Sequence, residues 1–268
     1  MTPPIVLSIA GFDPSSGAGI TADLKTCAAH NCYGISAITA LTVQSTAGVL
    51  RMEPLWPELV SETLFELAAD FTIAAVRIGM LGSGKVAETV AAFLETTKPP
   101  NIVLDPVLRA SSGSELLDAE GLEILRTRLL PIATVLTPNA PEAEALTGLP
   151  VHSLDEADKA ANRLREMGAL GVVITGGHLP EGIDLLKWQD SAGLKRRQEF
   201  PGEKLDSAST HGTGCAFATS IACSLALGRS LPEAVSHAKV YVAEAIKNAS
   251  PLGRGTGPVN HLYRWSKS

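Results

Sequence analysis

The chain has 268 residues, 45% of them hydrophobic, which is enough for one large α/β domain or two small ones. Its formal net charge is -6. The short basic run Lys195–Arg197 fits the flank of a surface hairpin better than a nucleic-acid patch. We therefore expect no nucleic-acid partner.

The four cysteines, Cys27, Cys32, Cys215 and Cys223, form no Cys-x-x-Cys pair. Neither a zinc site nor a disulfide framework is indicated, and free thiols are typical of a reducing compartment. The amino terminus has no basic region before its first apolar run, unlike a signal peptide, and no apolar stretch is long enough to span a bilayer. We expect a cytoplasmic protein with no membrane partner.

Short apolar runs alternate with amphipathic or alanine-rich segments, which predicts strands that alternate with helices. The expected strands cover residues 5–9, 35–43, 49–55, 74–78, 102–106, 134–137, 172–178, 183–190 and 194–200. The expected helices cover 20–30, 57–69, 119–130, 154–167 and 232–248, and three more end near 96, begin near 141 and follow 215. This order favours an α/β fold with a mostly parallel sheet covered on both faces. Because no Pro/Ser/Gly-rich linker divides the chain, we expect a single domain over residues 1–268.

Loops rich in glycine and polar residues follow the expected strands, and they can gather at one edge of the sheet. Ligands of open α/β sheets bind outside the carboxyl ends of the strands, so this edge is the expected site. The loops cover residues 11–19, 44–48, 79–84, 105–113, 138–142, 176–178 and 210–215.

The segment Thr210–Cys215 combines two glycines and two threonines directly before an alanine-rich apolar run that reads as a buried helix. A helix start offers free N–H groups and a partial positive charge, so the segment predicts an anion site. Cys215 falls in the first turn, where the helix field favours a thiolate. The alternative is a plain glycine-capped loop that enters a core helix.

The segment Gly79–Val86 approaches the P-loop pattern, but Val86 stands where that pattern has Ser or Thr to bind magnesium. A strand-to-helix loop with a solvated Lys85 is the expected structure.

Acidic and amide side chains follow two of the buried strands. Asp105 ends one strand, and Asn139 and Glu142 follow the next. Because Pro141 suits the first helical position and Glu142 and Glu144 suit the first turn, a place at a helix N-terminus explains both glutamates. The functional alternative is that Asn139 or Glu142 points at a metal–phosphate group.

Eight motifs, in a fixed order, resemble the hydroxymethylpyrimidine and phosphomethylpyrimidine kinases of thiamine synthesis, which belong to the ribokinase superfamily. Besides Thr-His-Gly-Thr-Gly-Cys at 210–215, they include Gly-Met-Leu within 78–81, Asp-Pro-Val at 105–107, Gly-Gly-His at 176–178 and Gly-Pro-Val-Asn-His at 257–261. The remaining motifs cover residues 9–26, 39–44 and 137–142, so that the resemblance extends over essentially the whole chain.

The resemblance implies a ribokinase-like three-layer α/β/α sandwich and a two-step reaction. ATP first phosphorylates the hydroxymethyl group of 4-amino-5-hydroxymethyl-2-methylpyrimidine, and the monophosphate is then phosphorylated to the diphosphate. The resemblance also implies Mg2+ and a homodimer. Phosphoryl transfer needs positioning and charge stabilisation, which the predicted anion site supplies.

The resemblance also assigns roles to individual residues. The backbone N–H groups of the anion loop would hold the transferred phosphoryl group, and Cys215 would be the base for the first transfer. Magnesium would lie near Asp105 and Glu142. The catalytic residues would be Gly212, Thr213, Gly214 and Cys215; the pyrimidine would be bound by Gly11, Ala18, Asp23, Gln44, Met80 and Val107; the nucleotide would be bound by Asn139, Thr175 and Lys239.

The chain departs from the family pattern at three positions. Ser111 and Thr175 stand where family members usually carry lysine, and Ser209 stands where asparagine is common. Two missing cations weaken charge neutralisation by about 1 to 3 kcal/mol each, which bears most on the more highly charged second transfer. Arg109 and Arg254 are the candidate replacements.

Two other functions remain open at this stage. A pyridoxal kinase would bind a similar flat nitrogen heterocycle with a hydroxymethyl group. A non-catalytic pyrimidine or nucleotide sensor would keep the fold without turnover, although Asp105, Glu142 and the intact loop at 212–215 argue against it.

Overall fold

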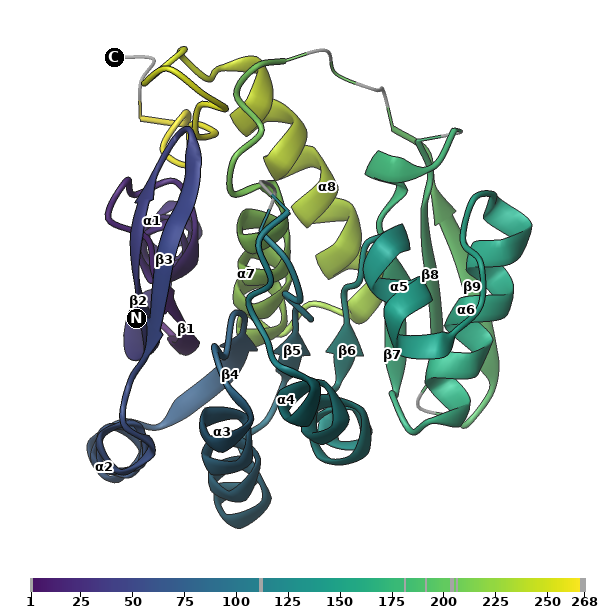
Figure 1. The fold of residues 1–268 in the computed structure, drawn as a ribbon. Helices are drawn as coiled ribbons and strands as arrows, with labels where there is room; N and C mark the ends of the chain where they lie inside the picture. The colour runs from purple at the N-terminus through teal and green to yellow at the C-terminus, as the bar shows by residue number, and fades with distance from the viewer. Residues whose placement is uncertain are drawn as a thin grey trace.

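The computed structural model describes residues 2–110, 113–180, 182–190, 192–202, 205 and 207–265. These residues build one nine-stranded sheet with the strand order β3-β2-β1-β4-β5-β6-β7-β8-β9 (Figure 1). The strands are β1 (Ile5–Phe12), β2 (Tyr33–Ser45), β3 (Gly48–Pro54), β4 (Ile73–Ile78), β5 (Ile102–Leu104), β6 (Val135–Leu136), β7 (Gly171–Ile174), β8 (Asp184–Gln189) and β9 (Lys195–Phe200).

The six strands from β2 to β7 in this order are parallel, and only the edges of the sheet are antiparallel, where β3 pairs with β2 and where β8 and β9 follow β7. The short central strands β5 and β7 are buried along their whole length. Uninterrupted apolar runs suit strands that are covered on both faces. The expected mostly parallel sheet is confirmed.

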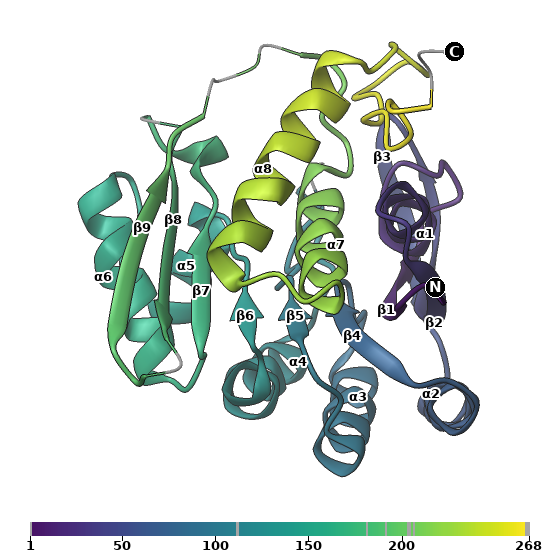
Figure 2. The same ribbon diagram turned by 180° about the vertical axis from the view of Figure 1, so that it is seen from behind.

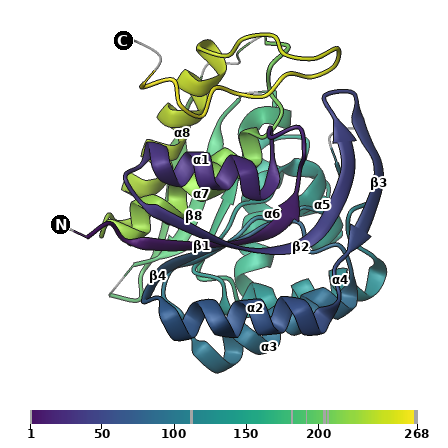
Figure 3. The same cartoon turned by 90° about the vertical axis from the view of Figure 1, so that its left-hand side faces the viewer.

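Helices cover both faces of the sheet (Figures 1 and 2). One face carries α1 (Gly19–Ala29), α7 (Thr213–Ala226) and α8 (Leu231–Lys247). The other face carries α2 (Pro57–Asp70), α3 (Gly84–Thr97), α4 (Ala119–Ile124), α5 (Ala140–Thr147) and α6 (Leu154–Glu166). The view in Figure 3 shows the sheet between α1 and α7 on one side and α2 and α3 on the other, which confirms the expected three layers.

Two apolar clusters fill the spaces between these layers. The larger one lies under α2 to α6 and includes Leu7, Ile78 and Phe93, all fully buried. The second lies under α1, α7 and α8 and includes Val103 and Ile221. Alternate residues of each strand enter opposite clusters, so the sheet face that a side chain occupies follows from its position along the strand.

Two expectations about local structure are resolved here. The helix expected over 119–130 is α-helical only to Ile124 and continues as a π-helical turn (Leu125–Leu129) and a 3-10 turn (Leu130–Ile132). The cause is Pro131, which lacks the N–H that an α-helix needs. The P-loop is excluded as expected, because Ser83 caps α3 through the amide of Val86 and Lys85 is exposed.

The basic run Lys195–Arg197 lies on β9 in a surface hairpin with β8, as expected. Arg196 pairs with Asp190, and Arg197 pairs with both Asp158 and Glu199. These contacts pair two of the three basic side chains within the chain. No helix among the described residues combines the length and the hydropathy that a membrane crossing requires.

Candidate active site

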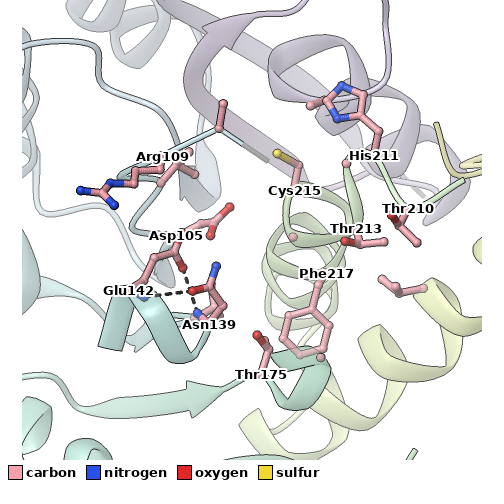
Figure 4. A pocket seen from close by; sticks show the side chains of 18 of the residues that line it. Asp105, Arg109, Asn139, Glu142, Thr175, Thr210, His211, Thr213, Cys215 and Phe217 are labelled. Carbon is pink, nitrogen blue, oxygen red and sulfur yellow. Dashed lines mark hydrogen bonds between the residues drawn. The ribbon is translucent and has the colours of Figure 1, made fainter. Parts of the chain in front are cut away.

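All seven loops that were expected to gather contribute residues to one cleft of about 1650 Å³. The cleft lies at the carboxyl ends of the parallel strands and extends to α8, which contributes Lys239. Figure 4 shows Asp105 and Cys215 facing the same opening from opposite sides, with Asn139 and Glu142 beside Asp105.

The segment Thr210–Cys215 forms the wall of the cleft at the start of α7. Gly212 is the cap of this helix and has a left-handed backbone (φ +84°), and a Cβ atom there would lie 1.9 Å from the carbonyl oxygen of Gly17. Only glycine fits such a position without strain. The first turn then leaves the N–H groups of Gly214 and Cys215 free of helical partners and near the cleft. The segment therefore keeps the free N–H groups that the anion prediction needs.

The Cys215 thiol is half-buried on the cleft. Burial raises its pKa to about 11, nearby Asp23 and Asp105 raise it further, and the guanidinium of Arg77 lowers it only in part. The expectation that the helix start favours a thiolate is therefore wrong, because burial and two carboxylates outweigh the helix field. Cys215 is a thiol at neutral pH.

Arg77 lies at the floor of the cleft and was not among the expected site residues. Its side chain is fully buried and donates from Nη1 to Asp23 Oδ2 at 3.0 Å and from Nη2 to Asp105 Oδ2 at 2.6 Å. Burial lowers the pKa of the guanidinium, but the two carboxylates raise it further than burial lowers it, so Arg77 keeps its charge. The available signal was an arginine inside the otherwise apolar strand β4.

Asp23 does not line the cleft, in contrast to the expected pyrimidine contact. It is fully buried on α1, where Ser8 and Thr219 donate hydroxyl hydrogen bonds of 2.6 and 2.7 Å to its carboxylate. The expectation fails because the helix turns this side chain toward Arg77 and the sheet.

The other five residues expected at the pyrimidine do line the cleft: Gly11, Ala18, Gln44, Met80 and Val107. Met80 and Val107 belong to a small apolar cluster, and a Cβ atom at Gly11 would lie 2.0 Å from Met80 Cε. Gln44 adds a polar edge, because its Oε1 accepts from the Thr42 hydroxyl at 3.1 Å. Apolar faces with one amide suit a flat aminopyrimidine ring.

Asp13 and His211 join the two glycine-rich loops of the cleft, and neither was assigned a role from the sequence. The Nε2 atom of His211 lies 2.8 Å from Asp13 Oδ2, while the same carboxylate accepts from the amides of Gly17 and Ala18. The Asp13 pKa is lowered: burial raises it, but hydrogen bonds from His211 and Ser15 outweigh burial. An acidic residue and a histidine inside two glycine-rich motifs were the available signal.

Asp105 and Glu142 lie beside each other on the cleft wall. Glu142 lies in the first turn of α5, as expected, and forms a reciprocal capping box with Asn139 through two hydrogen bonds of 2.9 Å. Burial raises the pKa of Glu142 to about 8, and repulsion from Asp105 adds to this. Burial also raises the pKa of Asp105.

These two carboxylates fit a divalent cation. Each is disfavoured in its charged form, and hard oxygen ligands of this kind are the ones that Mg2+ takes, usually with one or two carboxylates and substrate phosphates. The described residues hold no group of three or more His, Cys, Asp or Glu side chains placed to bind a metal by themselves. The pair would therefore share a cation with a phosphate ligand.

Thr175 and Lys239 line the far end of the cleft. Thr175 bridges to Asn139 as a short extension of the sheet, and Lys239 Nζ lies 2.9 Å from Asp184 Oδ2. The other oxygen of Asp184 accepts from the amide of Gly176 at 2.7 Å, so that the lysine is held beside the glycine turn.

The departures from the family pattern lie at different depths. Ser111 lies outside the described residues, and Thr175 is on the cleft. Ser209 is buried away from it, with its hydroxyl donating to the carbonyl of Ser250 at 3.5 Å. Of the two candidate cations, Arg109 lines the cleft and pairs with Glu115 at 3.5 Å, whereas Arg254 does not line it.

Comparison with known families and sequences gives a consistent result. Residues 13–260 match the family described as phosphomethylpyrimidine kinase. The chain is 42% identical over 253 residues, 94% of its length and 97% of the relative, to the hydroxymethylpyrimidine/phosphomethylpyrimidine kinase of Aquifex aeolicus. It is 43% identical over 259 residues, 96% of its length, to the thiamine biosynthesis bifunctional protein ThiED of Geobacter sulfurreducens, of which it spans 52%.

Solved structures include both kinds of vitamin kinase. An ADP complex of Bacillus subtilis pyridoxal kinase matches with a TM-score of 0.89 at 32% identity, covering 99% of this chain and all (100%) of the other. A phosphomethylpyrimidine kinase from Clostridium difficile matches with a TM-score of 0.79 at 36% identity, covering 91% of this chain and 99% of the other.

Proposed function

The chain belongs to the phosphomethylpyrimidine kinase family, and we propose that it uses ATP to phosphorylate 4-amino-5-hydroxymethyl-2-methylpyrimidine and then its monophosphate. One observation carries this proposal: the pocket formed by Gly11, Gln44 and Met80 opens directly onto the anion loop that begins α7. A flat ring in the pocket would therefore direct its hydroxymethyl group at Cys215 and the neighbouring amides.

The pocket holds the ring by complementary chemistry. Met80 and Val107 offer apolar contact, and the Gln44 amide offers both a donor and an acceptor to an aminopyrimidine edge. Ala18 lies at the start of α1, where its amide is engaged by Asp13, so that its small side chain leaves space for the ring.

The transferred phosphoryl group would bind at the amides of Gly214 and Cys215, with Gly212 and Thr213 setting the turn. Preorganised N–H groups stabilise the charge that develops on phosphoryl oxygens at no cost of reorganisation. Mg2+ held by Asp105 and Glu142 would neutralise the ATP phosphates when bound. Asn139, Thr175 and Lys239 would contact the nucleotide at the far end of the cleft.

Cys215 would receive the proton of the substrate hydroxyl in the first transfer. Its raised pKa means that only a small fraction is ionised at neutral pH, so the base acts from a minor population. In the second transfer the nucleophile is already an anionic phosphate, which needs no such base.

Pyridoxal phosphorylation is the second candidate. The likeness to the Bacillus subtilis pyridoxal kinase supports it, because a hydroxymethyl-bearing pyridine ring suits the same combination of apolar walls and one amide. Two relatives with higher sequence identity, 42% and 43%, carry the hydroxymethylpyrimidine/phosphomethylpyrimidine kinase name, which favours the pyrimidine.

A product analysis tests the proposal. Purified protein, ATP, Mg2+ and the hydroxymethylpyrimidine are followed over time by mass spectrometry, with pyridoxine in a parallel reaction. We expect monophosphate first and diphosphate afterwards. Monophosphate that accumulates without diphosphate would remove the second step, faster turnover of pyridoxine would favour the second candidate, and binding without any product would favour a sensor.

We also propose that residues 1–268 act as one domain in a cytoplasmic homodimer. The single continuous sheet supports the domain proposal. Exposed apolar side chains on the β2–β3 hairpin, Leu41, Val43 and Leu50, support self-association. Sedimentation velocity at micromolar concentration would test the dimer.

A further inference from the structure

The buried ion cluster beneath the cleft brings together three elements. Arg77 on β4 lies between Asp23 on α1 and Asp105 at the end of β5, and its donor atoms reach one oxygen of each. A Cβ atom at Gly79 would lie 2.0 Å from Arg77 Nη1. The absence of a side chain at Gly79 therefore leaves the space that the guanidinium fills.

The oxygen atoms of the two aspartates are used differently. Asp23 is fully engaged, because Oδ1 accepts from Thr219 while Oδ2 accepts from both Ser8 and Arg77. Asp105 is held through Oδ2 by Arg77 and also lines the cleft. Holding one oxygen of a carboxylate fixes its rotation, so the contact from Arg77 decides where the second oxygen of Asp105 lies.

Stability alone does not favour this cluster. Buried ion pairs of this type are often no more stable than apolar residues of similar volume, because desolvation offsets the attraction. Arg77 also has a buried Nε with no hydrogen-bond partner among the described residues, which adds a further cost. A role in positioning Asp105 explains why an arginine, with its two directed donor groups, is present at position 77.

We propose that Arg77 is a positioning residue that holds Asp105 by one oxygen and keeps its other oxygen aimed into the cleft toward the divalent cation. This inference rests on the proposed function in one respect, the cation at Asp105. Arg77 is fully buried and donates to two carboxylates, so it would act on the cation through Asp105. Asp23 holds the other end of the guanidinium through Nη1.

Replacement by lysine tests the fork geometry. In Arg77→Lys the charge stays, but a single ammonium group cannot make the same two directed contacts to Asp23 and Asp105. Thr219→Val is the matched control, because it removes a donor from Asp23 and leaves the Asp105 contact intact. A merely structural role for the cluster would make the two variants behave alike.

The readout is binding of Mn2+ in the presence of ADP, measured by electron paramagnetic resonance, together with kcat and KM. Residues that orient metal ligands typically change metal affinity by about 10- to 100-fold. We expect Arg77→Lys to weaken Mn2+ binding at least about tenfold and to lower kcat with an unchanged KM for the pyrimidine. Thr219→Val should keep the parent's Mn2+ affinity. Parent-like Mn2+ binding in Arg77→Lys, or equal weakening in Thr219→Val, would overturn the proposal.

The double variant Asp23→Asn/Arg77→Met covers the case in which Arg77→Lys does not fold. This variant removes one charge of each sign, so that no unpaired carboxylate remains at position 23. We expect the same loss of Mn2+ affinity as in Arg77→Lys. Parent-like Mn2+ binding in the double variant would also overturn the proposal. Mn2+ binding is measured without turnover, so this test does not depend on catalytic activity. A parent protein that phosphorylates neither alcohol would contradict the proposed function, but Mn2+ binding would still test the positioning role of Arg77.

Discussion

Cys215 shows how strongly the surroundings of one residue decide its chemistry. Its place in the first turn of α7 favours the thiolate, but burial beside Asp23 and Asp105 raises the pKa to about 11. Below that pH the ionised fraction rises about tenfold for each pH unit, because protonation follows a single-site equilibrium. A base of this kind makes the rate pH-dependent far above neutrality.

Removal of the Cys215 thiol should therefore separate the two transfers. We expect Cys215→Ala to slow the first transfer by roughly a hundredfold and the second by much less, since a positioned base typically contributes this much and the second nucleophile needs none. In the parent, kcat/KM of the first transfer should rise about tenfold per unit from pH 7 to 9, and Cys215→Ala should abolish this rise.

Initial rates with each substrate supplied separately provide the measurement. The second transfer of the parent, assayed over the same pH range, is the internal control. Equal losses in both steps, or an unchanged pH slope in Cys215→Ala, would show that the thiol is not the base.

Arg109 is the candidate replacement for a missing cation at the phosphates. It lines the cleft, its side chain is 68% exposed, and its contact with Glu115 at 3.5 Å is too weak to hold it firmly. We expect Arg109→Ala to lower kcat/KM of the second transfer about tenfold or more, because a hydrogen bond to a charged group contributes about 1.5–3 kcal/mol, and to affect the first transfer less.

Arg254→Ala is the matched control for Arg109, since it removes the same charge outside the cleft. Steady-state kinetics with the monophosphate as substrate, at two ionic strengths, would measure the effect. A parent-like second transfer in Arg109→Ala, or the same loss in Arg254→Ala, would contradict this role.

At the scale of elements, the two glycine-rich loops behave as one unit. The Gly17 carbonyl packs against Gly212, a Cβ atom at Gly17 would lie 2.3 Å from the His211 ring, and the Asp13–His211 contact joins the same loops. The pyrimidine pocket and the anion site are therefore built against each other and cannot shift independently.

Gly212→Ala should separate these loops. The variant combines a left-handed backbone with a backbone clash at 1.9 Å, which we expect to cost about 2 kcal/mol or more in the free energy of unfolding and to lower activity at least a hundredfold. Gly214→Ala is the control, because it lies in the first turn of α7 and a Cβ atom there meets nothing within 4 Å. Urea unfolding should show Gly214→Ala as stable as the parent or more so, and an equally stable Gly212→Ala would contradict the argument.

Sequence patterns were sufficient to predict the helices and strands, because hydrophobic periodicity and the glycine and proline residues that interrupt it are local features of the chain. They located the strands, the covering helices and the loops of the cleft, and five of the six residues that the family motifs predict at the pyrimidine lie on its walls. They failed for Asp23, because the phase of α1 that turns it toward the sheet depends on tertiary packing. Arg77 was missed because its partners lie 54 and 28 positions away in the chain. The pKa of Cys215 was misjudged for the same reason.

At the scale of the whole molecule, buried histidines link stability to pH. His30 donates from Nδ1 to the Thr26 carbonyl at 2.9 Å, and its Nε2 lies 2.8 Å from the Ser220 hydroxyl, so the neutral ring is fully satisfied. Burial lowers its pKa from 6.5 to about 4, helped by Arg264 and Arg229. Burial likewise lowers the pKa of His261 to about 4.

The sign of the linkage follows from proton counting. Between pH 6.5 and 4 these two histidines are protonated in the unfolded chain but neutral in the folded protein. Their contribution to the free energy of unfolding is therefore complete above pH 6.5 and decreases as the pH drops toward 4. At 1.36 kcal/mol per pKa unit, each histidine accounts for up to about 3 kcal/mol. Glu142 acts in the opposite direction, because its folded pKa of about 8 lets the native state hold a proton that the unfolded chain has released above pH 4.5.

Because these contributions oppose each other, the prediction concerns differences between variants rather than the parent curve. His30→Gln keeps a donor and an acceptor but cannot be protonated, so its free energy of unfolding should fall by about 3 kcal/mol less than that of the parent between pH 6.5 and 4. Glu142→Gln should instead gain stability relative to the parent as the pH rises from 4.5 to 8, because the parent loses the contribution of the proton that Glu142 holds. Urea titrations at half-unit pH steps would resolve both changes. Parallel curves for His30→Gln and the parent would mean that His30 is protonated in the folded protein, and that its environment is far wetter than its burial indicates.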